Sequence, residues 1–247
     1  MKWLDPEIVL GAYAVGVFPM ADHRNAETVY WVEPKRRAVL PLDGFRLSHS
    51  LRKVLAQDRY RVTADQAFGD VLALCGEAAP DRPETWINSS IAEVFGRLHD
   101  MGFAHSIECW DGDDLVGGLY GLALGRAFFG ESMVSRARDA SKVALAWLVA
   151  RLRAGGFTLL DCQFQTDHLA SLGAVEISRA DYLGLLSAAL SGLGDAAAAG
   201  GGAVPLSALA APSLADFFAL DRVGAASLAD SAPVNGKLIA QLLVQTS

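Results

Sequence analysis

The chain has 247 residues, of which 52% are hydrophobic and 20% are charged, and its formal net charge at pH 7 is −7. This composition is ordinary for a folded protein, and the length allows one large domain or two small ones. Averaged over the chain, the negative charge argues against nucleic-acid binding.

The first segment, residues 1–62, is predicted to form a small basic domain. Residues 5–16 carry apolar positions at helical spacing and end at the Phe18-Pro19 break. Short strands are expected near residues 29–32 and 38–40. Ser48 is a suitable N-cap for a helix that ends near residue 56.

Local charge in this segment differs from the average. Between Lys35 and Arg61, eight basic residues stand against two acidic ones, Asp43 and Asp58. This excess predicts either a surface that faces a polyanion or a solvated basic face without a partner. The basic residues are Lys35, Arg36, Arg37, Arg46, Arg52, Lys53, Arg59 and Arg61.

Residues 63–193 are predicted to form an α/β (α+β) domain. The Asp111-Gly112-Asp113 turn between two apolar runs is a strong hairpin signal. Helices with N-caps at Ser89 or Ser90 and at Asp139 flank three successive strands, an order that suggests an acyltransferase-like sheet. The expected elements are strands at 60–62, 104–110, 114–124, 127–133, 157–161 and 174–177, helices at 65–74, 89–101, 139–154 and 179–190, and a helical turn at 168–172.

The remaining residues, 194–247, are predicted to be a linker and a C-terminal extension. Residues 195–211 are rich in Ala, Gly and Ser, as flexible linkers are. Residues 214–220 are weakly amphipathic, and 236–243 form an apolar segment whose docking place the sequence does not indicate.

The cysteines and the N-terminal residues indicate the cellular compartment. Cys75, Cys109 and Cys162 are widely spaced, so we expect reduced thiols and no zinc-binding cluster. Asp5 and Glu7 stand where a signal peptide needs an apolar run, and no segment is long enough to cross a membrane. We therefore expect a cytoplasmic protein.

Two carboxylates stand in apolar runs. Phe128 and Phe129 lead into Glu131, and Leu159 and Leu160 lead into Asp161. A charge in such a run is costly to desolvate unless it is paired or used. Both are therefore candidates for chemistry, although a structural role as a cap for Asp161, or as a surface pair for Glu131, is the alternative.

Short motifs follow one another in a specific order over residues 8–186. They are Gly16-Val17-Phe18-Pro19, Tyr30-Trp31 with Pro34, Arg37-Ala38-Val39-Leu40, Thr85-Trp86-Ile87, Ala104-His105-Ser106-Ile107-Glu108, Gly117-Gly118-Leu119-Tyr120-Gly121, Phe129-Gly130-Glu131-Ser132-Met133, Ala140-Ser141-Lys142, Asp161-Cys162-Gln163 and His168-Leu169-Ala170-Ser171-Leu172-Gly173-Ala174. Together they resemble the leucyl/phenylalanyl-tRNA–protein transferase family.

The resemblance implies an enzyme that moves leucine or phenylalanine from charged tRNA to the N-terminal Arg or Lys of a protein, which marks that protein for degradation. The implied fold is a small N-terminal domain followed by a GNAT-like acyltransferase domain with a mixed, largely antiparallel sheet. The implied partners are Leu-tRNA, Phe-tRNA and the acceptor protein. No metal, cofactor or membrane is implied, and we expect a monomer.

The reaction implied by the resemblance has an amine attacking an activated ester. An α-amino group is largely protonated at neutral pH, so a carboxylate can attract it and take or relay a proton. Asp161 is the first choice for this role. Gln163 shares its strand face and can hold the ester carbonyl or ribose, and Glu131 can position Gln163 or the amine. The sequence leaves the proton route open, including assistance from the ribose 2′-hydroxyl.

The leucine or phenylalanine side chain needs an apolar pocket next to the carboxylates. Phe128, Met133, Leu119 and Leu160 suit a pocket for the aminoacyl side chain, although each alone could be plain core.

The terminal adenosine needs an aromatic ring to stack on. Trp86 and Tyr13 match family positions for it, and Trp31 keeps the second aromatic of a family pair. Met20 is a departure, because it replaces a family tryptophan.

The tRNA acceptor stem needs basic residues. Arg52 and Lys53 match a basic helix that touches it, with Arg46, Arg59 and Arg61 as possible additional phosphate contacts.

Three other classes compete with this interpretation. An acyl-CoA-dependent acetyltransferase needs a glycine-rich turn before the long helix, but residues 134–139 contain no glycine. A tRNA-binding protein without activity would not need Glu131, Asp161 and Gln163. An aminoacyl-tRNA-dependent peptidoglycan transferase would normally be larger and carry a duplicated domain, and the chain shows no internal repeat.

Overall fold

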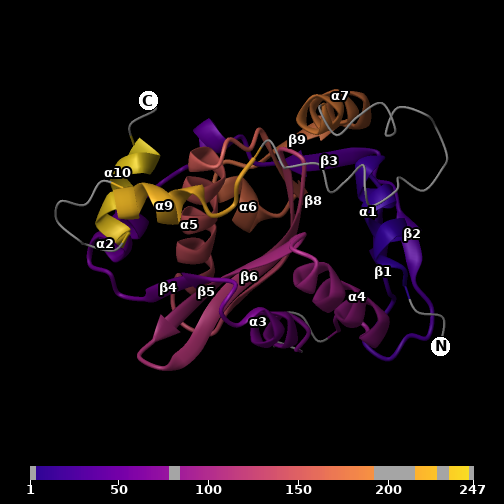
Figure 1. The fold of residues 1–247 in the computed structure, drawn as a ribbon, viewed down its shortest axis with the longest axis horizontal. Coiled ribbons are helices and arrows are strands. Elements are labelled where there is room, and N and C mark those ends of the chain that lie inside the picture. Colours follow the sequence, from indigo (N-terminus) through magenta and orange to yellow (C-terminus); the bar gives the residue numbers. More distant parts are fainter. Residues whose placement is uncertain (1–3, 78–83, 192–214, 227–233, 245–247) are drawn as a thin grey trace.

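A seven-stranded sheet forms the centre of the computed structural model, which describes residues 4–77, 84–191, 215–226 and 234–244 (Figure 1). Its order is β4-β5-β6-β7-β8-β3-β9, so β3 lies between two strands from the second half of the chain. The strands are β3 (Arg36–Val39), β4 (Arg61–Ala64), β5 (Ala104–Asp111), β6 (Asp114–Leu124), β7 (Ala127–Ser135), β8 (Leu159–Gln163) and β9 (Val175–Ser178).

The sheet is mixed and largely antiparallel, which confirms this part of the predicted fold class. Among the strands of the described residues, only β7 and β8 run parallel, with Phe128 beside Leu160 and Phe129 beside Asp161. Helix α5 (Ala140–Ala154) connects these two strands. The predicted hairpin is also confirmed, because β5 ends at Asp111, β6 begins at Asp114, and Gly112 in the turn has φ 63°.

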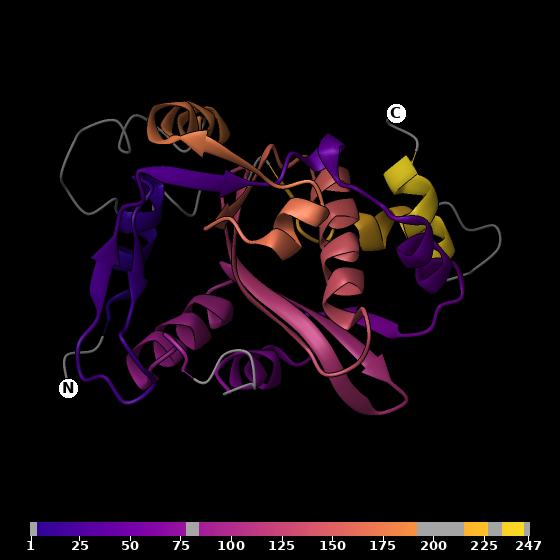
Figure 2. The ribbon, with the colours of Figure 1, turned by 180° about the vertical axis from the view of Figure 1, so that it is seen from behind.

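Helices cover both faces of the sheet, and a separate apolar cluster fills each side. One side holds α1 (Pro6–Ala14), α3 (Phe68–Cys75) and α4 (Ser89–Asp100); the other holds α2 (His49–Ala56), α5, α9 (Ala219–Ala226) and α10 (Gly236–Val244) (Figures 1 and 2). The short α6 (Asp167–Ser171) precedes β9, α7 (Arg179–Leu190) follows it, and a 3₁₀ turn spans Leu42–Gly44.

Two adjacent glycines in β6 let helices approach the sheet from opposite faces. A Cβ on Gly117 would lie 2.6 Å from the Cβ of Ala140, the first residue of α5. On Gly118 it would lie 3.2 Å from a methyl carbon of Val71 in α3. Since successive strand residues face opposite sides, the two glycines leave room for α5 on one face and α3 on the other.

The N-terminal segment contributes to two layers. Strands β1 (Phe18–Met20) and β2 (Tyr30–Val32) form an antiparallel pair of their own. Strand β3 is instead an inner strand of the main sheet. The division at residue 62 stays a prediction, and residues 36–39 within that segment share the large sheet.

The helix caps confirm some local predictions and correct others. Ser48 caps α2, as its Oγ accepts from Leu51 N at 3.2 Å. For α4 the prediction of Ser89 or Ser90 was wrong: extended Asn88 caps the helix, accepting from Ile91 N at 2.9 Å, whereas Ser89 is already helical. Asp139 is the N-cap residue of α5, as predicted, but its side chain makes no capping bond; its Oδ1 accepts from Lys142 Nζ at 2.9 Å instead.

The C-terminal extension docks on the body of the protein. Helix α9 packs on α5, and α10 packs on α2 and α5. The predicted linker at residues 195–211 lies outside the described residues. No helix in the described ranges combines the length and the apolar character needed to cross a membrane.

Candidate active site

An apolar cavity of about 260 Å³ lies against β6, β7 and β8. Helix α5 contributes Leu145 and Leu148 to its wall, and Glu131 and Gln163 are two of the polar residues there. Pockets for drug-sized ligands measure about 300–1,000 Å³. The cavity is therefore suited to one small apolar group with a polar centre beside it.

The polar centre is a buried pair formed by Glu131 and Gln163, which are 8% and 6% exposed. Gln163 Nε2 donates to Glu131 Oε1 at 2.8 Å. In the β6–β7 register Tyr120 faces Ser132 and Gly121 faces Gly130, so Glu131 is the extra residue of a β-bulge. Side chains of a regular strand point alternately to the two faces of the sheet. A bulge interrupts this alternation, so the direction of the Glu131 carboxylate does not follow from its position in the strand.

Gln163 is held in an uncommon backbone conformation, with φ 62°. A non-glycine residue in the left-handed region costs about 1–3 kcal/mol and persists only where surrounding contacts fix it. One such contact is the hydrogen bond from Gln163 N to Asp161 Oδ1 at 2.8 Å. Asp161 therefore fixes the backbone from which the Gln163 side chain reaches Glu131.

Asp161 itself is fully buried and is not part of the cavity wall. Arg37 Nε donates to both carboxylate oxygens, at 2.9 and 3.0 Å, and Nη2 donates to Oδ2 at 2.6 Å. Tyr182 Oη donates to Oδ2 at 2.8 Å. Together with Gln163 N, these donors engage both oxygens of the Asp161 carboxylate. The geometry favours a positioning role over the expected contact with the acceptor amine.

Arg37 joins three parts of the chain at this point. It is 1% exposed, and its guanidinium lies between the rings of Phe18 and Tyr182, 4.7 and 4.5 Å from their centroids. Nη1 donates to Gly16 O at 3.1 Å. Counting Arg37 among the residues of a basic surface was therefore wrong, because a charged side chain at this position is buried against its counter-ion.

Burial raises the pKa of Glu131 to about 8, although hydrogen bonds to its charged form from Tyr13 and Gln163 act in the opposite direction. Tyr13 Oη and Glu131 Oε2 are both buried polar atoms on this pair of neighbouring residues. Neither atom has another partner within the described parts of the chain. Burial thus favours the protonated form of Glu131, and a cation entering the cavity would favour its ionised form.

The four residues expected to form the aminoacyl pocket do not all reach it. Leu119, Met133 and Leu160 line the cavity. Phe128 does not: it is fully buried, stacked on Phe217 at a centroid distance of 5.8 Å and packed on Phe157. Sequence reasoning missed Leu145 and Leu148, although their spacing on α5 shows that they share one face of that helix.

The aromatic candidates also separate into two groups. Trp86 and Met20 lie in the cavity wall. Tyr13 is fully buried against Phe129, so the expectation that it stacks on an adenine was wrong. Trp31 is 41% exposed on β2, outside the wall. Phe164 was missed; it is 47% exposed and lines the cavity.

The histidines of the family motifs, His105 and His168, lie in different surroundings. His105 Nδ1 is hydrogen-bonded to Asp65 Oδ2 at 2.7 Å, an arrangement that gives it a structural role. His168 was given no role, yet it lines the cavity, and burial lowers its pKa. In the described part of the chain no group of His, Cys, Asp or Glu side chains is arranged to hold a metal ion.

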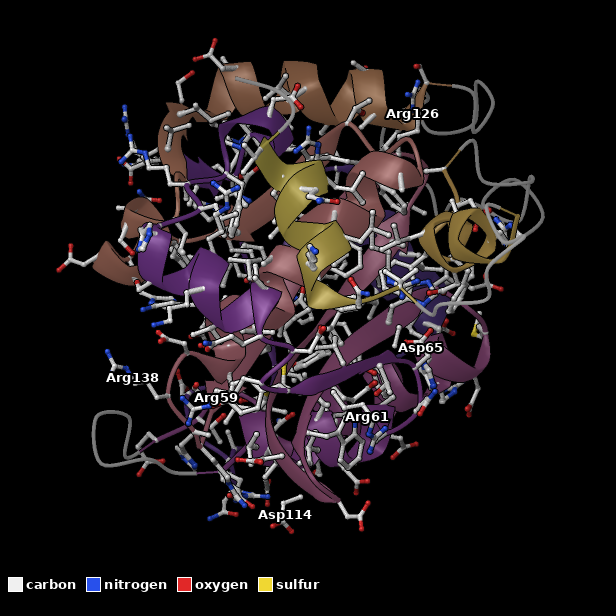
Figure 3. All side chains as sticks on the ribbon, turned by 90° about the vertical axis from the view of Figure 1, so that its left-hand side faces the viewer. Arg59, Arg61, Asp65, Asp114, Arg126 and Arg138 are labelled. Atoms are coloured by element: carbon white, nitrogen blue, oxygen red, sulfur yellow. The ribbon has the colours of Figure 1, made fainter. Side chains whose placement is uncertain are left out.

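The basic residues predicted to bind tRNA lie on and beside α2. Arg46, Arg52 and Lys53 are exposed. Figure 3 looks onto the side of the molecule that carries α2 and α10, and it shows Arg59 and Arg61 there. Arg36 lies elsewhere, paired with Glu176 at 2.7 Å. The basic surface is thus smaller than the sequence count suggested.

A small apolar cavity beside a buried carboxyl–amide pair, on a mixed sheet, is suited to an enzyme that holds an apolar group next to a polar centre. The model of the family described as "Leucyl/phenylalanyl-tRNA protein transferase" matches residues 39–187, and that of its N-terminal domain matches residues 4–35. The chain belongs to the leucyl/phenylalanyl-tRNA protein transferase family and is therefore an aminoacyltransferase.

Relatives with that name agree. The one from Rhizorhabdus wittichii is 61% identical over 100% of both chains. The one from Zymomonas mobilis is 60% identical over 76% of this chain and 70% of the relative, and the one from Novosphingobium aromaticivorans is 50% identical over 99% and 97%. A solved structure described as "The structure of L-PGS from Bacillus licheniformis" is similar with a TM-score of 0.38 and 11% identity, over 63% of this chain and 51% of that one.

Proposed function

We propose that the protein transfers leucine or phenylalanine from aminoacyl-tRNA to the N-terminal Arg or Lys of acceptor proteins, which creates an N-terminal degradation signal. The observation that carries this proposal is the Glu131–Gln163 pair at the wall of an apolar cavity. The cavity suits the donor's side chain, and the pair supplies polar groups where the ester and the amine must meet.

The donor's terminal adenosine is assigned to the side of the cavity where Trp86 and Met20 lie. Stacking of an indole ring on a base contributes about 1–3 kcal/mol to binding, and a methionine offers a weaker apolar contact. Leu119, Met133 and Leu160 then surround the leucine or phenylalanine side chain. The acceptor stem is assigned to Arg46, Arg52 and Lys53, whose charges are exposed.

The chemical step forms an amide C–N bond and breaks the ester C–O bond, and one amine proton ends on the departing ribose oxygen. The acceptor's ammonium must first lose a proton, because its pKa is about 7.7–8.0. Arrival of this cation favours ionisation of Glu131, whose carboxylate then attracts the ammonium. Gln163 keeps its Nε2 on Glu131, so its carbonyl oxygen is the group that can orient the amine.

Asp161 is assigned a supporting role in this scheme. It holds the Gln163 backbone through a hydrogen bond of 2.8 Å, and Arg37 and Tyr182 hold its carboxylate. It therefore acts as a positioning residue that fixes the glutamine relative to Glu131. The GNAT-like character of the fold is likewise a proposal, supported by the α5 connection between parallel β7 and β8.

An acyl-CoA donor is disfavoured by the start of α5. A pyrophosphate needs free backbone N–H groups at a helix N-terminus. Here Ala140 N donates to Ala137 O at 3.2 Å, and Ser141 N donates to Ser135 Oγ at 3.2 Å. Asp139 also places a carboxylate beside that end.

Single-turnover transfer from Phe-tRNA to a peptide that begins with Arg tests the proposal. Gln163→Ala should lower the rate strongly, because it removes the amide that meets Glu131. Gln165→Ala is the matched control, since Gln165 Nε2 donates to Ala174 O, outside the cavity. Transfer should also fall steeply with added salt. Equal rates for the two variants, or a rate that does not change with salt, would reject the assigned site.

A further inference from the structure

We propose that the docked C-terminal extension, residues 215–226 and 234–244, is part of the tRNA-binding face: α10 braces the basic helix α2 and adds Lys237 to a surface for the phosphates of a double-stranded RNA stem. The inference rests on the proposed function, which places the acceptor stem at α2. The extension lies beyond residue 187, where the match to the family model ends.

The first part of the extension is anchored by Arg151 of α5, which is 3% exposed. Its guanidinium donates to both carboxylate oxygens of Asp221, at 2.6 and 2.9 Å, and to Phe217 O at 3.0 Å. The Phe217 ring is stacked on His105 with 4.1 Å between ring centroids. A bidentate pair and a buried aromatic ring fix the start of the extension against the sheet.

Helix α10 then packs on the inner face of α2. Ile239, Ala240 and Leu243 are 0%, 4% and 6% exposed. The backbones approach so closely that a Cβ on Gly236 would lie 2.2 Å from Leu55 O, the carbonyl of an α2 residue. The contact therefore depends on a glycine at this point, and it fixes the position of α2 (Figures 1 and 2).

The same contact changes the charge that α2 presents. Asp58 is the one acidic residue in the sequence from Arg46 to Arg61. Its Oδ1 accepts from Gly236 N at 2.5 Å, so this carboxylate is directed at the positive end of α10. Lys237, the next residue, is exposed.

None of the cations on this face forms an ion pair with another described residue, which leaves them available for phosphates. They are Arg46, Arg52, Lys53, Arg59, Arg61 and Lys237. Docking of α10 thus engages the Asp58 carboxylate and adds a cation, and both effects favour a polyanion.

Two donors separate this role from general support of the fold. Phe-tRNA reaches both the cavity and α2, whereas phenylalanyl-adenosine reaches the cavity alone. Gly236→Ala should raise KM for Phe-tRNA several-fold and leave kcat/KM for phenylalanyl-adenosine unchanged. Gly184→Ala is the control, because a Cβ there meets nothing within 4 Å. If Gly236→Ala impairs both donors equally, or neither, the inference is overturned.

Binding of uncharged tRNA tests the charge contribution without relying on transfer. Lys237→Gln should reduce the slope of log Kd against log salt by about 1, as expected for one lost phosphate contact. Arg97→Gln, which removes an exposed cation from α4 on the other side of the sheet, should leave the slope unchanged. An unaltered slope for Lys237→Gln rejects its contact with tRNA. If wild type binds tRNA at this face yet transfers from neither donor, the proposed function fails and the inference stands.

Discussion

Replacing Glu131 by glutamine should stabilise the protein at neutral pH, and the gain should grow as the pH rises from 5 to 8. Burial raises the pKa of Glu131 to about 8 in the folded state. In the unfolded chain a glutamate titrates near pH 4.3–4.5, roughly. Between these values the folded state keeps a proton that the unfolded state has released, so the free energy of unfolding falls as the pH rises.

The size of the effect follows from the difference between the two pKa values. Each pKa unit corresponds to about 1.4 kcal/mol. The contribution of Glu131 to the free energy of unfolding therefore falls by roughly 3 kcal/mol between pH 4.5 and pH 7. Glutamine has nearly the same shape and can still accept from Gln163 Nε2, but it does not titrate. A change of this size is a large share of the 5–15 kcal/mol, roughly, that stabilises a typical domain.

Urea unfolding at pH 5, 6, 7 and 8 measures the difference between wild type and Glu131→Gln. Glu93→Gln, which removes an exposed carboxylate from α4, controls for the loss of one negative charge. We expect the advantage of Glu131→Gln to increase steadily over this range. A difference that stays flat from pH 5 to pH 8 would show that the folded protein holds Glu131 ionised, and the reasoning about its burial would be refuted.

Further predictions follow from the same contacts. Arg37→Met should destabilise the protein by about 3–5 kcal/mol, because Asp161 stays buried without its counter-ion, and adding Asp161→Asn should restore part of this loss in urea unfolding. Met133→Phe should narrow the cavity and lower kcat/KM for Phe-tRNA more than for Leu-tRNA, by roughly tenfold in the ratio. Binding of an Arg-peptide at pH 7 should release protons as Glu131 ionises; calorimetry in two buffers should detect this for wild type and not for Glu131→Gln.

The parts of the fold that the sequence predicted are those fixed by local chemistry. A two-residue turn with Gly112 determines the β5–β6 hairpin, and Ser48 caps α2 through a bond to a residue three positions away. Glu131 was singled out because its carboxylate sits in an apolar run, and the family resemblance suggested that it positions either Gln163 or the acceptor amine.

The parts that it missed depend on contacts between distant residues. Arg37 and Asp161 are 124 positions apart, and nothing in the local pattern of either shows that the two charges neutralise each other. The bulge at Glu131 breaks the alternation from which strand faces are inferred. The docking of α10 on α2 requires the close approach at Gly236, which no periodicity reveals.

The most direct test of the central claim is transfer of labelled leucine from charged tRNA to two peptides, one beginning with Arg and one with Ala, read by mass spectrometry. Wild type should label the Arg peptide alone, at its N-terminus, and Gln163→Ala should lose this label while the protein stays folded. Label on both peptides, or undiminished label with Gln163→Ala, would contradict the assignment of acceptor choice and catalysis to the Glu131–Gln163 cavity.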